Sequence, residues 1–211
     1  DPWRSWAGGG LGLGEAEGFG CSADADVGPL RTVVRMEHPT EVNKLAVCPH
    51  RPQLIATKAV TGEVLLFDYK AERASGVSPD ARLRPDGEEV DGFALDWSPL
   101  QKQLLASGGN DGRLCIWDVD VVAKASPSSP LHSTKAHERG LCDLGFSYTE
   151  PSVLATVGED GKLHIWDVRA GLGARPSLVM AASSDEVLSV DWSPHAARTL
   201  ATAGKERDVS I

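Results

Sequence analysis

The chain has 211 residues, 41% of them hydrophobic, and it carries 21 basic against 30 acidic side chains, for a net charge of −9. This acidity disfavours the phosphate backbone of nucleic acid as a direct ligand and suits a basic protein segment better. No apolar run approaches the roughly 18 residues of a membrane span, and the four cysteines, which form no Cys-x-x-Cys pair, are expected to be reduced thiols.

The first 29 residues are rich in glycine and poor in apolar side chains, so we expect residues 1–29 to form a loop or a disordered lead-in. The run GGGLGLG at 8–14 fits neither the GxGxxG nor the P-loop pattern, which disfavours a phosphate-binding loop. From residue 30 the sequence is typical of strands. The β-branched segment 31–36, RTVVRM, predicts the first one.

The remaining chain, 30–211, is a repeat array. LCIWDV at 114–119 returns as LHIWDV at 163–168 and, in weaker form, as VLLFDY at 64–69. The aromatic residues Phe67, Trp117 and Trp166 recur at intervals of 50 and 49 residues, close to the length of a propeller blade. The repeats are expected at about 38–86, 87–136, 137–182 and, truncated, 183–211.

Each repeat contains three short apolar segments in the same order, followed by a weaker fourth segment that suits an exposed edge strand. Asp-Gly pairs at 111–112 and 160–161 predict tight antiparallel hairpins between the second and third strands. We expect first strands at 42–49, 93–99, 141–148 and 187–194, second strands at 53–59, 103–109, 152–158 and 198–204, and outer strands at 81–86, 131–136 and 178–183.

Four strands per unit, closing with Trp-Asp, resemble the WD-repeat β-propeller, an all-β fold. In that family a His, a Ser or Thr, an Asp and the Trp of each repeat form a hydrogen-bonded set. The resemblance places complete or partial sets here at His137, Thr156, Asp160 and Trp166, at Ser107, Asp111 and Trp117 without a His, and at His38 and Thr57 with Phe67 in place of Trp. Ser183 or Ser184 stands at the His position of the last repeat.

A His-Asp pair could suggest general acid–base chemistry, but His137 and Asp160 fall on the structural positions of the family, which favours a scaffold role. The sequence has no GxSxG elbow, HExxH, P-loop or paired Cys/His spacing. We therefore expect a protein without catalytic residues, cofactor or bound metal.

The first two repeats resemble a narrower family. EVN at 41–43, IATK at 55–58, VLLFDY at 64–69 and RLR at 82–84, followed by an acidic-Gly-aromatic step, are similar to the histone-binding WD-repeat proteins of the retinoblastoma-binding type. That resemblance implies a fragment of a seven-bladed ring, with about three full blades and part of a fourth. It also implies a non-catalytic subunit of chromatin complexes, nuclear with a cytoplasmic pool, that binds the histone H3 tail, histone H4 in the full-length protein, and other chromatin-complex subunits.

The resemblance assigns histone-tail binding to residues near the start of the first strands, namely Glu41, Asn43, Asp91, Phe93 and Glu186. Carboxylates can accept an Arg in bidentate fashion, and an aromatic ring can stack on its guanidinium. Two positions depart from the family, because Cys142 stands where it has Glu and Leu188 where it has Asn. These departures predict weakened or retuned H3 binding.

Two other functions fit parts of the sequence. Trp166-Asp167-Val168-Arg169 is similar to the WDxR signature of propellers that act as substrate receptors of cullin-type ubiquitin ligases, and related propellers assist ribosome assembly. Of the remaining residues, Lys58 is expected in solvent near a strand end. Trp97 and Trp192 are expected to pack between blades.

Overall fold

The computed structural model describes residues 34–71, 78–85, 90–122, 128–170 and 175–211. Contacts divide the chain into residues 1–35 and residues 36–211, and all the strands described below belong to the second unit. The predicted strand at 31–36 is wrong where it can be seen, since residues 34–36 are not in a strand, and its first three residues lie outside the described part. The predicted lead-in 1–29 also lies outside the described residues.

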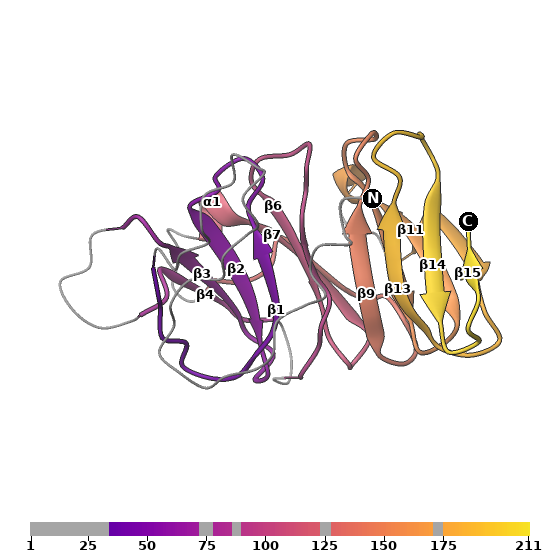
Figure 1. Ribbon diagram of the computed structural model, residues 1–211, viewed down its shortest axis with the longest axis horizontal. Coiled ribbons are helices and arrows are strands. Elements are labelled where there is room, and N and C mark those ends of the chain that lie inside the picture. Colours follow the sequence, from indigo (N-terminus) through magenta and orange to yellow (C-terminus); the bar gives the residue numbers. More distant parts are fainter. Residues whose placement is uncertain (1–33, 72–77, 86–89, 123–127, 171–174) are drawn as a thin grey trace, which may run out of the picture. The chain divides into compact units, whose positions relative to one another are not determined.

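Four antiparallel sheets follow one another along the chain, as the repeats predict (Figure 1). The first, blade 1, contains β1 Val42–Val47, β2 Leu54–Ala59, β3 Val64–Asp68 and β4 Ala81–Leu83. Blade 2 contains β5 Leu95–Trp97, β6 Leu104–Gly108, β7 Arg113–Asp118 and β8 His132–Lys135. Blade 3 contains β9 Leu141–Phe146, β10 Val153–Gly158, β11 Lys162–Asp167 and β12 Leu178–Ala181. Blade 4 contains β13 Val187–Trp192, β14 Leu200–Gly204 and β15 Val209–Ser210.

In every sheet the strands are hydrogen-bonded in chain order, so the first strand of each blade is at one edge. These first strands, β1, β5, β9 and β13, contact the first strand of the next blade and are therefore called the inner strands. Short helices follow two of the third strands, α1 Val119–Val122 after β7 and η2 Val168–Ala170 after β11. Neither is long enough to cross a membrane, and no other helix occurs among the described residues.

The apolar core lies between successive blades rather than inside one of them. Leu66 and Leu83 of blade 1 pack with Leu105 and Trp117 of blade 2, and similar clusters join blades 2 and 3 and blades 3 and 4. This arrangement follows from the strand patterns, because strands with apolar side chains on both faces can be buried only when a second sheet covers each face.

Two tryptophans of the inner strands link neighbouring blades, which confirms their predicted packing. The indole N–H of Trp97 donates to the Ala46 carbonyl of blade 1 at 3.0 Å, and that of Trp192 donates to the Gly145 carbonyl of blade 3 at 2.9 Å. Each side chain thus buries its apolar body between two sheets and satisfies its one donor across the interface.

Candidate peptide-binding face

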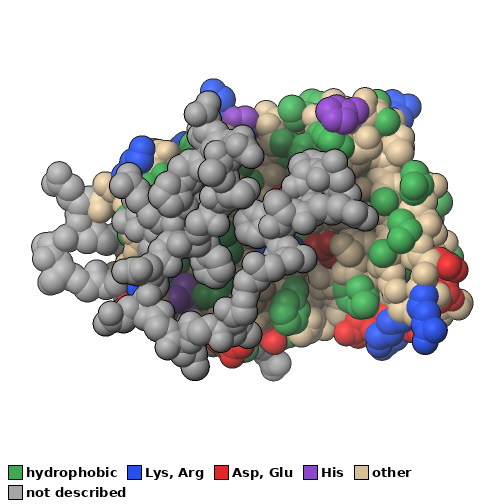
Figure 2. Space-filling model, viewed as in Figure 1, with side chains coloured by type: hydrophobic (Ala, Val, Ile, Leu, Met, Phe, Trp, Pro, Cys, Tyr) green, Lys and Arg blue, Asp and Glu red, His purple; other side chains and the backbone are tan. Residues whose placement is uncertain are grey.

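One surface of the array is made by the four hairpin turns after β2, β6, β10 and β14, together with the segments that lead into the inner strands. We call this surface the turn face. In Figure 1, β14 ends at the lower edge of the view, and in Figure 2 acidic and basic side chains gather along the same edge. The turns of blades 1 to 3 have a glycine with positive φ, at Gly62, Gly112 and Gly161, whereas blade 4 has Arg207 there with φ of 67°.

The complete hydrogen-bonded set of blade 3 joins the turn face to the core. His137 Nδ1 lies 2.9 Å from Asp160 Oδ1, and its Nε2 lies 2.9 Å from Thr156 Oγ1. The indole of Trp166 donates to the same Thr156 hydroxyl at 2.9 Å. Because His137 and Thr156 are fully buried, this chain of bonds fixes the segment before β9 against the β10–β11 turn.

Burial lowers the pKa of His137, and the hydrogen bond that its ring donates to Asp160 opposes this shift. Burial alone would raise the pKa of Asp160, but the hydrogen bond with His137 and those from two backbone amides lower it. The pair is therefore best described as a neutral imidazole donating to a carboxylate. Both imidazole nitrogens already have partners, so this histidine has no free lone pair for general-base chemistry.

His164 lies beside this set, and His137, Asp160 and His164 offer ligand atoms that all lie within 4.8 Å of one another. The two imidazole rings are nearly parallel, with centroids 4.3 Å apart and an angle of 9° between their planes. The lone pairs of two stacked rings run side by side and do not converge on one point, as the ligand atoms of a metal site must. Burial lowers the pKa of His164, as it does for His137. The geometry fits a stacked structural pair better than a metal site.

The other blades contain partial versions of this set. In blade 2 the Trp117 indole donates to Ser107 at 3.0 Å, while Asp111 accepts from the amide of its own turn residue Arg113. In blade 1, His38 Nε2 lies 2.9 Å from Thr57 Oγ1 and its ring is 5.6 Å from the ring of Phe67, which has no donor. Since blade 2 has no His in this position, its turn is held by other contacts.

Blade 4 has other residue types at both the histidine and the aspartate positions of the set. The backbone N–H of Ser184 donates to Glu206 Oε1 at 3.1 Å, and its hydroxyl donates to the same oxygen. Glu206 occupies the turn position that Asp160 has in blade 3, and Ser183 stands at the histidine position, so that Ser184 corresponds to Glu138, whose amide donates to Asp160. A serine–glutamate contact thus connects the entering segment to the turn where the sequence lacks a histidine, although here it is exposed.

The carboxylates assigned to tail binding occupy equivalent positions in different blades. The backbone carbonyls of Glu41, Asp91 and Glu186 each accept from an amide of the hairpin turn in their own blade, at 3.1, 2.7 and 3.1 Å. Gly140 has this position in blade 3. The turn face therefore presents one carboxylate per blade in blades 1, 2 and 4, and none at this position in blade 3.

Two of the assigned residues contact each other across blades 1 and 2. The side-chain amide of Asn43 donates to the carboxylate of Asp91 and, at 3.1 Å, to the carbonyl of Gly92. Glu186 lies elsewhere on the turn face, where it pairs with Arg139 at 3.3 Å and Lys205 at 2.7 Å. The side chain of Phe93 is 53% exposed. The structure thus brings Asn43 and Asp91 together and gives Glu186 basic partners from its own chain.

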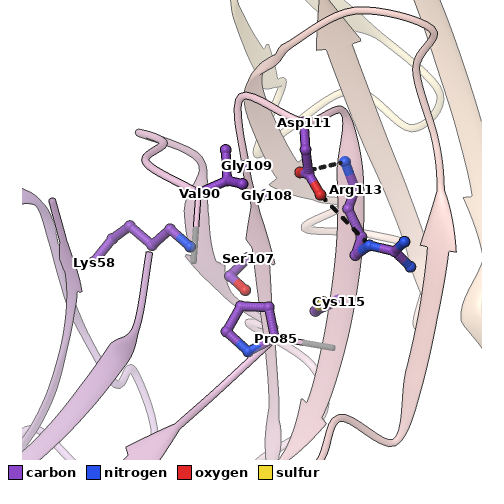
Figure 3. Close-up of a pocket in the computed structure, with 9 residues that line it drawn as sticks. All are labelled: Lys58, Pro85, Val90, Ser107, Gly108, Gly109, Asp111, Arg113 and Cys115. Carbon is purple, nitrogen blue, oxygen red and sulfur yellow. Dashed lines mark hydrogen bonds and ion pairs between the residues drawn. The ribbon is translucent and has the colours of Figure 1, made fainter. Parts of the chain in front are cut away.

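The prediction that Lys58 lies in solvent is wrong, because the residue is only 1% exposed. Its ammonium donates to the carbonyl of Gly62 at 2.6 Å, and it borders a cavity of about 10 Å³, enough for about one water molecule. Figure 3 shows its side chain extending from β2 toward Val90 and Ser107. Burial lowers the pKa of Lys58, and the nearby Cys115, Asp111 and Asp91 oppose this shift.

A signal for this burial was present in the repeats. The positions of Lys58 in the other three blades are taken by Gly108, Val157 and Ala203, which are small or apolar. A residue at this step of the second strand faces the next blade, so the charge of Lys58 is enclosed between β2 and blade 2.

Three comparisons relate the chain to known proteins. The sequence model of the family described as WD domain, G-beta repeat matches residues 87–118 and 128–167. Histone acetyltransferase type B subunit 2 of Gibberella zeae is 32% identical over 137 residues, which cover 63% of this chain and 32% of the relative. The chain thus spans about a third of the length of that relative.

A chain in the crystal structure of the mitotic checkpoint complex matches over 72% of this chain and 43% of its own length, with a TM-score of 0.59 and 21% identity. At that identity the likeness concerns the fold alone, and it agrees with the four successive antiparallel sheets.

Proposed function

We propose that the chain is a WD-repeat protein that serves as a non-catalytic scaffold subunit of chromatin-assembling or chromatin-modifying complexes. It binds a basic histone tail, that of H3, on the turn face. The observation that carries the proposal is the 32% identity to a subunit of a histone acetyltransferase. As the match covers only 32% of that relative, the partners of the whole protein, including histone H4 and other complex subunits, belong to the proposal too.

The chemistry of the turn face supports a basic ligand. Turn amides donate to the backbone carbonyls of Glu41, Asp91 and Glu186 and hold these residues at equivalent positions. Because these hydrogen bonds use only the backbone, they do not neutralise the charges of the three carboxylates. The partners of Glu186, Arg139 and Lys205, are exposed side chains that an incoming Lys or Arg can displace at small cost. The net charge of −9 adds long-range attraction for a basic tail.

The same proposal places the protein in the nucleus, with a cytoplasmic pool, and expects no direct contact with nucleic acid. The seven-bladed ring implied by the resemblance stays a prediction for the whole protein. Catalysis is not part of the proposed function, because the one His-Asp pair on the turn face is bonded into the structural set of blade 3.

The alternative role as a ligase substrate receptor gains no support from Arg169. Its guanidinium is bound by Asp167 at the end of β11, with Nη2 2.5 Å from Oδ2 and Nε 3.0 Å from Oδ1. This exposed pair can be displaced at small cost, so it does not distinguish a docking residue from an ordinary surface ion pair.

The test is a titration of the full-length protein with a labelled, unmodified H3 N-terminal peptide. Glu41→Lys and Asp91→Lys are expected to weaken binding at least tenfold each, since each replaces an attractive charge by a repulsive one. Asp120→Lys provides a matched control, because Asp120 is an exposed carboxylate of α1, away from the turn face. Absence of binding by the folded wild-type protein, or equal loss in the control, would refute the proposal.

A further inference from the structure

Four equivalent positions on the turn face carry an extra residue at the start of an inner strand. The pairing of β1 with β2 shifts between Val42 and Lys44, which leaves Asn43 as the unpaired residue of a bulge. The same shift leaves Cys142 unpaired in blade 3 and Leu188 unpaired in blade 4. In blade 2, Gly92 lies against Gly109, and the carbonyl of Ala94 accepts from the amide of Gly108. Phe93, which lies between Gly92 and Ala94, therefore has the same position as the unpaired residues of the other blades.

We call Asn43, Phe93, Cys142 and Leu188 the bulge arc. A β-bulge turns its extra side chain away from the regular alternation of the strand, and bulges are frequent beside binding sites. Three of the four side chains of the arc are apolar. Phe93 is 53% exposed and Leu188 is 46% exposed, whereas Cys142 is half-buried. These exposed apolar groups therefore contribute little to the core.

The apolar members of the arc belong to neighbouring blades that are tied together beside them. The carboxylate of Asp143, next to Cys142, accepts from the hydroxyl of Ser189 and from the amide of Val190, both at 3.1 Å, in the two residues that follow Leu188. Leu141, on the other side of Cys142, packs against Gly108 and lies near Ala94, the neighbour of Phe93. The three apolar positions of the arc thus lie in the successive blades 2, 3 and 4, which these contacts join.

Carboxylates surround this arc. Burial, and to a lesser extent the charges of Glu159, Glu186, Asp143 and Asp160, together raise the pKa of the Cys142 thiol to about 11. The thiol therefore stays protonated at neutral pH and behaves as a small apolar group. An apolar strip with acidic neighbours matches a ligand that has an apolar side chain next to basic ones.

We propose that Phe93, Cys142 and Leu188 form an apolar subsite on the turn face, which selects basic tail segments with an aliphatic or aromatic residue beside a Lys or Arg. This inference rests on the proposed function and specifies its ligand. Two of its residues, Cys142 and Leu188, stand where the resemblance expects Glu and Asn. The subsite therefore replaces two polar contacts with the ligand by burial of an apolar side chain of the ligand.

The test compares two capped peptides, Gly-Gly-Arg-Leu-Lys-Gly-Gly and the same peptide with Ser in place of Leu, against the full-length protein. Wild-type protein is expected to bind the Leu peptide about fivefold more tightly, which corresponds to about 1 kcal/mol. In Leu188→Asn, a nearly isosteric change at an exposed position, the preference is expected to fall below twofold with little change for the Ser peptide. In Phe93→Ser the preference is expected to fall below twofold as well, with weaker binding of both peptides, because Phe93 also belongs to the residues assigned to tail binding.

The outcomes separate the two proposals. Equal binding of both peptides by wild-type protein overturns the apolar subsite and leaves the proposed function standing. A Leu preference that survives in both variants also overturns it, because the preference then arises elsewhere. Failure of wild-type protein to bind either of these peptides or the H3 peptide overturns the proposed function itself. Cys142→Glu provides a further measurement, since it is expected to raise affinity for the Ser peptide and abolish the preference.

Discussion

The hydroxyl of Thr156 shows how much one buried atom can hold in this fold. It is within 2.9 Å of both His137 Nε2 and the Trp166 indole nitrogen, and the residue is fully buried. Thr57 has the same position in blade 1, but it meets only one such nitrogen, from His38, because Phe67 replaces the tryptophan. The two threonines therefore form a natural comparison.

Thr156→Val is expected to lower the free energy of unfolding by about 2 to 4 kcal/mol, since it leaves two buried polar groups without their partner. Thr57→Val is expected to cost about 1 to 2 kcal/mol by the same reasoning for one group. Urea unfolding followed by tryptophan fluorescence measures both. Equal losses would mean that the indole bond of Trp166 contributes nothing measurable.

Many single residues of the site could be located from the repeats alone, because a hydrogen-bonded set needs fixed residue types at fixed spacing. The contacts of His137 lie where that spacing expects them. Spacing does not show which charged side chains pair with one another: Arg139 of blade 3 and Lys205 of blade 4 both pair with Glu186, outside the repeated set. For Lys58 the residue type alone predicted solvent, whereas the small or apolar residues at its equivalent positions in the other blades indicate burial.

Positive φ occurs in the hairpin turns of the turn face and, at Ser152 and Arg198, just before β10 and β14. At Gly112, φ is 74°, and a Cβ there would collide with the backbone oxygens of His137 and Arg139. Arg207 adopts nearly the same φ, 67°, with a side chain. The left-handed conformation costs a non-glycine residue roughly 1 kcal/mol or more.

Opposite effects are therefore expected from two exchanges of glycine. Arg207→Gly is expected to stabilise the β14–β15 hairpin by about 0.5 to 1 kcal/mol, whereas Gly112→Ala is expected to destabilise the protein by more than about 2 kcal/mol through the collision. Thermal unfolding of the two variants beside wild type measures both. A destabilised Arg207→Gly variant would show that contacts of the arginine outweigh its backbone strain.

Asp96 links the inner strands of blades 2 and 3 and gives this contact a pH dependence. Its carboxylate accepts from the amide of Phe146 at 2.9 Å. Burial, with a smaller contribution from Asp143, raises the pKa of Asp96 to about 6, although backbone hydrogen bonds and Lys44 oppose the shift. Because the folded-state pKa exceeds the ordinary value near 3.8, the stability from this group is fully present below pH 3.8 and is lost as pH rises through about 6.

Asp96→Asn removes this titration and keeps an acceptor for Phe146. Relative to wild type, the variant is expected to gain stability between about pH 4 and 7.5, by up to about 3 kcal/mol. Urea unfolding at both pH values measures this gain, and Asp120→Asn controls for the loss of one exposed charge. A constant difference between Asp96→Asn and wild type across the range would contradict a raised pKa of Asp96.

Strands and turns were the most predictable elements, since alternation and Asp-Gly pairs act locally. The described strands fall within or beside the expected ranges, including the weak outer strands β4, β8 and β12. The prediction for segment 31–36 is wrong because a β-branched pattern shows only that a strand is compatible with the sequence. A strand also needs a neighbour to pair with, and residues 34–36 pair with none among the described strands.

At the scale of the whole molecule, apolar side chains remain exposed on both the first and the last blade. Val42, Leu45 and Val47 of β1 are 40–55% exposed, and Val209 of β15 is 68% exposed. Apolar side chains are also visible over the β13–β15 side of Figure 2. Exposed apolar surface along strands favours association with other chains.

The 211-residue chain, expressed by itself, is therefore expected to self-associate. Sedimentation velocity at increasing concentration should show species larger than the monomer, and Leu45→Lys with Val47→Lys should reduce them. A monomer that unfolds in one sharp transition over this range would contradict the prediction. The repeats predict that the blades pack against one another. They do not predict how exposed the apolar side chains on the outer sides of the first and last blades are, because this depends on what covers them.

Four hydrogen bonds that involve the inner strands of neighbouring blades, or the segments that lead into them, join residues at nearly constant distances along the chain. The contacts of Asn43 with Asp91, Ala46 with Trp97, Asp96 with Phe146 and Gly145 with Trp192 span 47 to 51 positions. The loop that closes when a blade docks on its neighbour thus has the same length at every step, and so has its entropic cost. Folding can then begin at any adjacent pair of blades and spread in both directions, with a rate set by that pair rather than by the length of the array.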